Sequence, residues 1–485
     1  MLNKKTRYLV NLKYVALLVS AMVSWQSNTI FAKESIWYQS DDPLKTKAFT
    51  PPPIPEGYLE RGVCDTMTDE KKLSLADVAE TALCNNPQTQ EAYASARVQA
   101  AQVGIAQSAY LPTVIDNIAS NLNITFPQQT TRSNPYSNLS NNIVASYLLY
   151  DFGNRDAALE NARQLLQAAS ATQSNVVQIV LLSAIQAYYQ VQASTAALEA
   201  ALEAEHASEE SFKAAQARYL AGVSTPADKL QAQTLFAQNT LNRISIEGNL
   251  KNAYGTLANV MGLAANQNLK IMPSVIVETS NNIEQDIQAL IEQAGSRRPD
   301  LMASEAQLKA AQASIEVSKA ASKPIVSIGV SNGFQSGNSL ASSDNSSLGV
   351  TVSIPIFSGY APTYRIRAAE ANFDVRTAQR DKLRLQISLD VWRAYQNLHT
   401  ANESIKAAVI LVSSAEESSR VAMGRYKAGV GNILNSINAQ SALASARQQQ
   451  IQATLNWNIA RATLAQAIGS LDNAMIQLLP AAKNQ

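Results

Sequence analysis

The chain has 485 residues and balances 39 lysine and arginine residues against 38 aspartate and glutamate residues. This balance excludes the strongly basic surface that a nucleic-acid partner needs. Charged residues make up 16% and aromatic residues 6% of the chain, which is typical of long helices packed through small side chains rather than of a thick aromatic core.

The chain begins with the pattern of an export signal at residues 1–32. Basic residues precede the apolar stretch 14–23, and Ala32 offers a small side chain at the cleavage position. The alternative is an N-terminal membrane anchor, for which the apolar stretch is short. Residues 33–72 contain a proline cluster and no periodic pattern, so we expect an extended arm.

From residue 73 onward the sequence pattern occurs twice. The segment Arg218-Tyr219-Leu220-Ala221-Gly222-Val223 returns as Arg425-Tyr426-Lys427-Ala428-Gly429-Val430, at an offset of 207 residues. The same offset joins Ala232-Gln233 to Ala439-Gln440 and Gly262 to Gly469. A repeat of this length indicates a duplicated half-protein. We expect a first repeat at 73–263, a connector at 264–283, a second repeat at 284–470 and a tail at 471–485.

Each repeat is expected to open with two helices separated by a proline, and to continue with a β-hairpin. In the first repeat, a short helix breaks near Pro87, and a second one runs from about 88 to 110. The second repeat copies this pair at 283–294 and 300–322. Alternating apolar and small residues then predict hairpins at about 113–150 and 325–357.

The clearest strand pattern places Leu348, Val350 and Val352 on one face, against small and polar residues on the other. A segment rich in serine and asparagine, 336–347, is expected to join the two strands of this hairpin. The alternation fits a half-buried soluble sheet and a lipid-facing wall equally well.

A very long helix follows each hairpin. Residues 154–221 and 361–428 lack internal proline and, apart from Gly424, internal glycine, and at 1.5 Å per residue each helix would extend about 100 Å. The chain then turns at tips predicted at about 218–226 and 425–433, and returns as a shorter helix. No other stretch after the leader approaches 18 consecutive apolar residues, so we expect no membrane-spanning helix.

Four strands from one chain cannot close a barrel, and open strand edges in lipid leave backbone groups without hydrogen bonds. Closure therefore requires several copies of the chain. Two copies supply 8 strands, whose interior fills with side chains, while three supply 12 and leave a lumen. With the long helices continuing the wall, the geometry predicts a conduit.

These features together resemble the TolC family of outer-membrane channel proteins. The resemblance covers residues 73–470 and rests on the duplicated tips, the opening Leu73–Ala79, the Asn-Pro breaks and the strand-to-helix junctions at 150–153 and 356–359. It implies a mainly helical homotrimer in which four strands per chain form a 12-stranded β-barrel in the outer membrane, continued by an α-helical barrel in the periplasm. It also implies a periplasmic adaptor and an inner-membrane transporter as partners, and no catalysis or cofactor.

The resemblance assigns roles to residues at the tips. The acidic ring at the periplasmic constriction corresponds here to Asn435 and Asn438, and the basic gate residue corresponds to Gly431, so this chain departs from the pattern. Asp228 and Tyr426 match gate partners, and a weaker latch between them is our hypothesis; the alternative is that Asp228 offsets a helix dipole. The repeated tip residues are expected to contact the adaptor: Arg218, Tyr219, Ala221, Gly222, Val223, Arg425, Tyr426, Ala428, Gly429 and Val430. The alternative for the basic ones is helix capping.

The two cysteines, Cys64 and Cys84, are expected to form a disulfide, because exported chains meet an oxidising compartment. Two unpaired thiols are the alternative. The sequence thus predicts the exit duct of a tripartite efflux pump or a type I secretion system. The alternative from another class is a secreted coiled-coil structural or adhesive protein. The sequence does not disclose the cargo.

Overall fold

The computed structural model describes residues 42–55, 72–124, 136–273, 286–338 and 340–472. The predicted export signal, Cys64 and the residues beyond 472 lie outside the described residues. The chain divides into two units, at 1–49 and 50–485. In the first unit the structure describes one short 3-10 helix, η1 (Thr46–Phe49), preceded by Asp42, whose carboxylate accepts a hydrogen bond from the Thr46 N–H at 2.7 Å.

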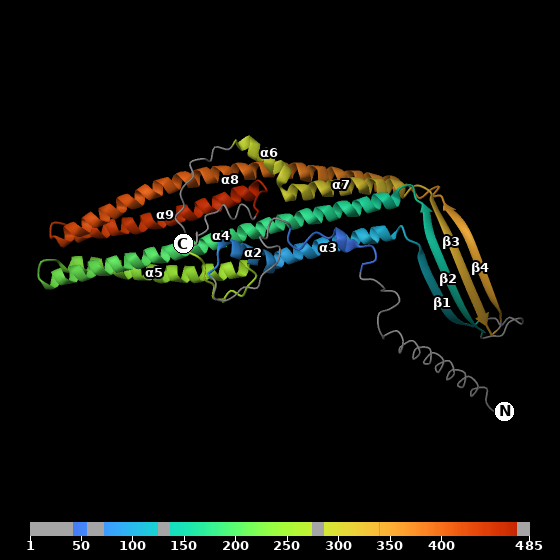
Figure 1. Cartoon of the computed structure of the whole chain (residues 1–485), viewed down its shortest axis with the longest axis horizontal. Coiled ribbons are helices and arrows are strands. Elements are labelled where there is room, and N and C mark those ends of the chain that lie inside the picture. Colours follow the sequence, from blue (N-terminus) through green and yellow to red (C-terminus); the bar gives the residue numbers. More distant parts are fainter. Residues whose placement is uncertain (1–41, 56–71, 125–135, 274–285, 339, 473–485) are drawn as a thin grey trace, which may run out of the picture. The chain divides into compact units, whose positions relative to one another are not determined.

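In the second unit, the two halves repeat one another helix by helix (Figure 1). The short helices α2 (Leu75–Asn85) and α6 (Ile287–Arg297) have 11 residues each, and α3 (Pro87–Ser108) and α7 (Pro299–Ala320) have 22. The long helices α4 (Asn154–Leu220) and α8 (Ala361–Lys427) have 67 residues each, and the returning helices α5 (Pro226–Val260) and α9 (Ile433–Ala467) have 35. The prediction of two duplicated, mainly helical halves is confirmed.

Local sequence sets the helix boundaries. Pro87 and Pro299 occupy the first turns of α3 and α7, where the missing N–H costs nothing. Gly262 and Gly469 follow the ends of α5 and α9 with φ of +72° and +74°. A Cβ at Gly262 would lie 2.5 Å from the Asn85 carbonyl oxygen, and one at Gly469 would lie 2.9 Å from the Arg297 carbonyl carbon. Glycine therefore allows each returning helix to end directly against the short helix of its own half.

The four strands form one antiparallel sheet in the order β1 (Thr113–Asn123), β2 (Tyr136–Tyr150), β3 (Ile325–Gly337) and β4 (Leu340–Ser353). The pairing of β2 with β3 joins the two halves, so β1 and β4 are the two edges of the sheet. The segment 336–347, expected to be a connection, is mostly strand. Its polar side chains bond across the hairpin, as in Asn332 Nδ2 to Asp344 Oδ1 at 3.0 Å, and so the ladder extends.

Register divides the side chains of this sheet into an apolar face and a polar face. Cross-strand partners such as Val330 and Leu348, or Ile328 and Val350, lie on one face. That face continues through Tyr147 on β2. The opposite face carries mainly serine, asparagine and glycine, together with apolar residues such as Ile115, Val144 and Leu148. No helix of the described part packs against either face, and Leu348 is 72% exposed.

The main hydrophobic core surrounds the middle of α4. Its residues Val177, Leu181 and Ile185 are almost fully buried among side chains of α2, α5 and α9. Beyond this core, α4 packs along α5 and α8 packs along α9, as two helical hairpins that meet where α4 contacts α9.

One helix of the described part, α4, contains a window long and apolar enough to cross a membrane by length and composition. The expectation of no such segment was therefore too strict. The apolar residues of α4 at 177–191 lie in the main core, and a buried core helix passes the same test, so packing accounts for this apolar window.

Candidate functional site

The two helical tips have the same backbone structure. After α4, the Val223 N–H donates to the Arg218 carbonyl and the Gly222 N–H donates to the Tyr219 carbonyl, both at 3.0 Å. After α8, Val430 and Gly429 make the same two bonds, also at 3.0 Å. This is the Schellman arrangement, which requires a left-handed residue at the helix end. Gly222 and Gly429 supply it with φ of +74° and +82°.

The first tip holds the second through Arg218. Its Nη1 donates to the Tyr426 carbonyl oxygen at 3.0 Å, and its guanidinium lies 5.1 Å from the centroid of the Tyr426 ring. Tyr426 is 3% exposed. The contact combines a charge-assisted hydrogen bond with a cation–π interaction, and it joins α4 to α8 at the last turn of each helix.

A small apolar cluster lies beneath this contact and contains residues of α4, α5, α8 and α9. Ala215 of α4 and Ala232 of α5 form a shallow seat that is covered by Tyr426 of α8 and Ile433 of α9. The alanines allow the hairpins to approach closely, since a larger side chain at either position would occupy the space of the tyrosine ring. Beside the cluster, Gln440 Nε2 donates to Ser211 Oγ at 2.8 Å.

Asp228 has a local partner at the start of α5. Its carboxylate accepts from the Thr225 N–H at 3.2 Å, while its own N–H donates to Thr225 Oγ1 at 3.3 Å, which completes a capping box. The hydroxyl of Tyr426 is buried without a hydrogen-bond partner in the part that the structure describes. Burial raises the pKa of this phenol; the charge of Arg218 opposes the rise and that of Asp228 adds to it. The latch between Asp228 and Tyr426 stays a prediction.

Gly431, the position without the basic gate residue, lies against the end of α8. A Cβ there would be 3.0 Å from the Arg425 carbonyl carbon and 3.0 Å from the Tyr426 nitrogen. The returning loop thus runs directly over the last turn of α8. A basic side chain at this position would require the loop to move.

The remaining predicted residues lie on the surface of the tips. Asn435 and Asn438 are exposed on the first turns of α9, and Asn435 lines a hollow of about 370 Å³ with Arg425. Tyr219 is 38% exposed, and Val223 and Val430 are 63% and 70% exposed. Ala221, Gly222, Ala428 and Gly429 are exposed as well. An apolar, exposed end on both tips is compatible with docking of another protein.

Sequence reasoning missed an ion-pair centre farther from the tips. Arg447 of α9 contacts Glu203 of α4 and, at 3.1 Å, Glu416 of α8. It therefore bridges both hairpins. No sequence signal could reveal this cluster, because its three residues are far apart in the chain. The Ser211–Gln440 contact did leave one signal, since Gln440 belongs to the repeated Ala-Gln pair.

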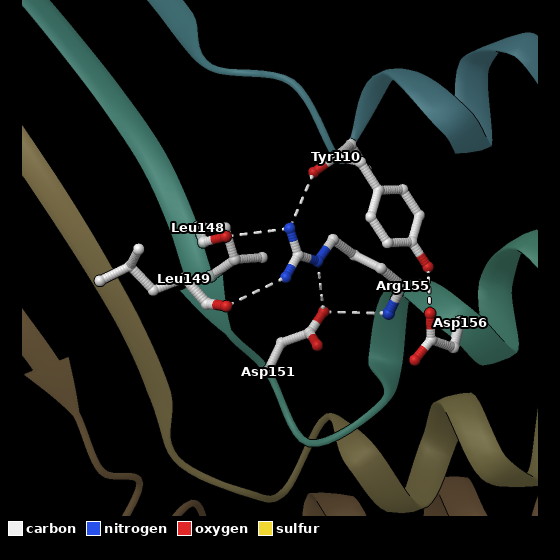
Figure 2. A network of polar contacts seen from close by, with 7 residues as sticks. Tyr110, Leu148, Leu149, Asp151, Arg155 and Asp156 are labelled. Atoms are coloured by element: carbon white, nitrogen blue, oxygen red, sulfur yellow. Dashed lines mark hydrogen bonds and ion pairs between the residues drawn. The ribbon is translucent and has the colours of Figure 1, made fainter.

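A second polar centre lies where the sheet meets α4 (Figure 2). The Arg155 guanidinium donates to the Leu148 carbonyl at 2.9 Å and forms an ion pair with Asp151 at 3.2 Å. It also covers the Tyr110 ring, 4.8 Å from its centroid. Tyr110 donates in turn to Asp156, and burial together with this hydrogen bond raises its pKa to about 12. One arginine thus fixes the ends of β2, α3 and α4 to one another.

We call the polar contacts around Arg155 the elbow. The corresponding junction of the second half is built from exposed apolar residues. Phe357 and Tyr360 stack edge to face, with ring centroids 5.5 Å apart, and are 75% and 68% exposed.

The predicted disulfide involves Cys84, which is half-buried near the end of α2, just before α3 begins. Because Cys64 lies outside the described residues, the Cys64–Cys84 pairing stays a prediction.

Comparison with known proteins places these features in a family. A sequence model described as "Outer membrane efflux protein" matches residues 78–263 and 290–470, one stretch in each half. The chain is similar to Protein CyaE of Bordetella pertussis, with 28% identity over 436 residues, which cover 88% of this chain and 91% of that protein. It is also similar to Outer membrane protein TolC of Vibrio cholerae, with 25% identity over 413 residues, covering 82% and 91%.

Solved structures share the fold. The outer-membrane channel OprN superposes with a TM-score of 0.73 at 21% identity, over 82% of this chain and 90% of that one. The outer membrane protein VceC of Vibrio cholerae gives 0.71 at 19% identity, over 81% and 96%. At these identities the likeness concerns the arrangement of helices and strands, which agrees with the duplicated halves described above.

Proposed function

The chain belongs to the outer membrane efflux protein family, and from that membership we propose that three copies form the exit duct of a tripartite efflux pump or a type I secretion system. As a member of this family, the chain is an outer-membrane efflux channel and not an enzyme. Membership also decides against the alternative of a secreted structural or adhesive protein. The trimer, the adaptor and the transporter are the finer parts of the proposal.

The observation that carries the proposal is the uncovered sheet. One face is apolar and exposed, the other is mainly polar, and the edge strands β1 and β4 each lack a neighbour on one side within the described chain. In water such a sheet would aggregate, while in lipid its edges would leave backbone groups unbonded. Closure of β4 of one copy onto β1 of the next satisfies both edges, and three copies give 12 strands around a polar lumen.

A hollow among the helices, lined by both polar and apolar side chains, is large enough to hold water. A cavity of about 860 Å³ lies between α3, α4, α7 and α8. Its lining is divided equally between amide or hydroxyl side chains and apolar side chains, with Glu91 and Arg376 as the two charged ones, and Arg376 donates to Gln307 Oε1 at 3.1 Å. With Asn435 and Asn438 at the tips, the duct would carry little net charge. Such a lining suits cargo that passes without strong electrostatic binding.

Two measurements on the detergent-extracted protein test whether it forms a trimeric duct: its molecular mass and its conductance. We expect the mass of three chains and stable conducting events in planar bilayers. A monomer, or a trimer without conductance, would overturn the proposal.

Site-directed crosslinking in cells tests the adaptor. A photo-reactive residue at Val223 or Val430 should link to the hairpin domain of a periplasmic adaptor, whereas one at Leu241, which is 64% exposed away from the tips, should not. Equal crosslinking at all three positions would contradict docking at the tips.

A further inference from the structure

The second tip carries a seat like the one that the first tip uses within the chain. In the first half, the seat consists of Ser211, Ala215 and Ala232 with Arg218 above them, and it is covered by Tyr426 and Gln440 of the second half. At an offset of 207 residues, the second half has Ser418, Ala422, Arg425 and Ala439, identical in type at every position.

Within the described part of a single chain, the second seat is open. Arg425 and Ser418 are exposed, and together with Ala422 and Ala439 they line the 370 Å³ hollow between the end of α8 and the start of α9. In the first half the equivalent residues Ser211 and Ala215 are fully buried. The difference comes from the covering hairpin, which one seat has and the other lacks.

The residues that could cover the open seat are also repeated. Tyr219 stands 207 residues before Tyr426, and Gln233 stands 207 residues before Gln440. Tyr426 and Gln440 cover the first seat, whereas Tyr219 is 38% exposed and Gln233 is exposed. The chain therefore carries one used and one unused copy of the seat and of the tyrosine and glutamine that cover it, while Ile433, the third covering residue, corresponds to Pro226.

We propose that the open seat of each chain is covered by the first tip of a second copy of this chain. Arg425 then binds the carbonyl and the ring of Tyr219 in the neighbouring copy, and Ser418 accepts a hydrogen bond from its Gln233. This inference rests on the proposed trimer. The sheet order supports the direction, because β4 of the second half and β1 of the first half are the free edges. Around the proposed trimer, the second half of one copy would therefore lie beside the first half of the next copy, both in the sheet and at the tips.

The two kinds of seam would differ farther from the tips. Within the chain, Arg447 and Glu203 strengthen the contact between the hairpins. Their repeat positions hold Thr240 and Ile410, and Ile410 is 67% exposed. The seam between copies thus repeats the tip contacts without the ion pair. Separation of the tips should then begin between copies rather than within them.

Thiol crosslinking tests the pairing. The variant Gln233→Cys/Ser418→Cys, treated with a short bismaleimide in native membranes, should give covalent dimers and trimers on denaturing gels, and each single variant should not. The matched variant Ser211→Cys/Gln440→Cys should react within one chain, because Gln440 Nε2 and Ser211 Oγ are 2.8 Å apart, and should give no covalent oligomer. The single variants also control for Cys64 and Cys84.

The outcomes separate this inference from the proposed function. Protein with the mass of three chains that forms no covalent oligomer through positions 233 and 418, while 211 and 440 react, overturns the inference and leaves the trimer. Protein with the mass of one chain overturns both. As a second readout, Tyr219→Ala and Arg425→Ala should raise closed-state leakage by similar factors, and the double variant should leak no more than either single variant. Additive effects would contradict the pairing.

Discussion

Arg218 makes the contact that joins the two tips. It reaches the second hairpin through two different groups of one residue, the carbonyl and the ring of Tyr426. At Gly431, where the family resemblance places a basic gate residue, a Cβ would already press on the backbone of α8. The cation that holds the tips together therefore comes from the first hairpin.

Replacing Arg218 should loosen the closed tips. A hydrogen bond from a charged group to a buried carbonyl contributes about 1.5–3 kcal/mol, so Arg218→Ala should shift the balance between closed and open tips by about tenfold or more. Closed-state leakage in planar bilayers measures the shift. Tyr426→Phe is the matched control, because the hydroxyl has no partner among the described residues and the ring and carbonyl remain. Equal leakage in both variants would assign the effect to the tyrosine hydroxyl.

The latch hypothesis makes a different prediction at Asp228. If the carboxylate holds the tips closed, Asp228→Ala should raise closed-state leakage. The capping box predicts instead a loss of stability by about 1 kcal/mol at the start of α5. Unchanged leakage together with a lowered melting temperature would remove the latch and leave the cap.

Glycines near the second tip offer a test of packing. Gly431→Ala should destabilise the protein by about 1–3 kcal/mol, since the new Cβ meets backbone atoms at 3.0 Å. Gly424→Ala lies in α8 with open space around the new Cβ, and should stabilise by about 0.5–1 kcal/mol. Thermal unfolding in detergent compares the two variants. A loss of stability in both would indicate that this end of α8 does not stay helical.

At the scale of elements, the elbow around Arg155 makes the two sheet-to-helix junctions different. The first junction is tied by the polar bonds of Arg155 within one chain. Both junctions present exposed aromatic residues, which are Tyr150 and Phe152 at the first and the more exposed Phe357 and Tyr360 at the second. The physical consequence is that the first half fixes the direction of α4 through its own polar contacts, while both junctions have apolar surface left to bury against another molecule.

The pKa of Tyr110 gives the elbow a pH dependence. Its folded pKa is raised from 10.0 to about 12, so the stability that the neutral phenol contributes is complete below pH 10 and is lost as the pH rises from 10 towards 12. Tyr110→Phe should therefore lose less melting temperature than the wild type between pH 8 and pH 11. Buried tyrosines elsewhere affect both proteins equally. Identical losses in the two proteins would show that Tyr110 does not hold its proton more tightly in the fold.

At the scale of the whole molecule, the absence of carboxylates at Asn435 and Asn438 bears on the current that the duct carries. Three copies would place six amides rather than six carboxylates around the narrow end, and amides attract neither ion strongly. We expect the wild type to show weak selectivity between potassium and chloride.

The double variant Asn435→Asp/Asn438→Asp should become cation-selective, as measured by the reversal potential across a potassium chloride gradient. The shift should shrink as ionic strength rises, because salt screens exposed charges. Gln449→Glu adds the same type of charge at an exposed position farther along α9 and should change the reversal potential less. Equal shifts would place the narrowest charged part of the duct away from the tips.

The sequence by itself determined the duplication, the helices and the tip turns, because these follow from local signals. Prolines open α3 and α7, glycines close α4 and α8, and the 207-residue offset matches every pair of helix lengths after the hairpins. Strand lengths were less well predicted. The serine-rich segment 336–347 continues the ladder through cross-strand bonds that are invisible in a single strand.

Only the tertiary structure decided which residues meet. It brought Arg218 to Tyr426, gave Asp228 a capping partner and joined Arg447 to two carboxylates on different helices. It also showed that no helix covers the apolar face of the sheet in the described chain, which alternation could not settle. Contacts between residues some 200 positions apart depend on how the two hairpins pack, and packing is a property of the assembled helices rather than of any local stretch.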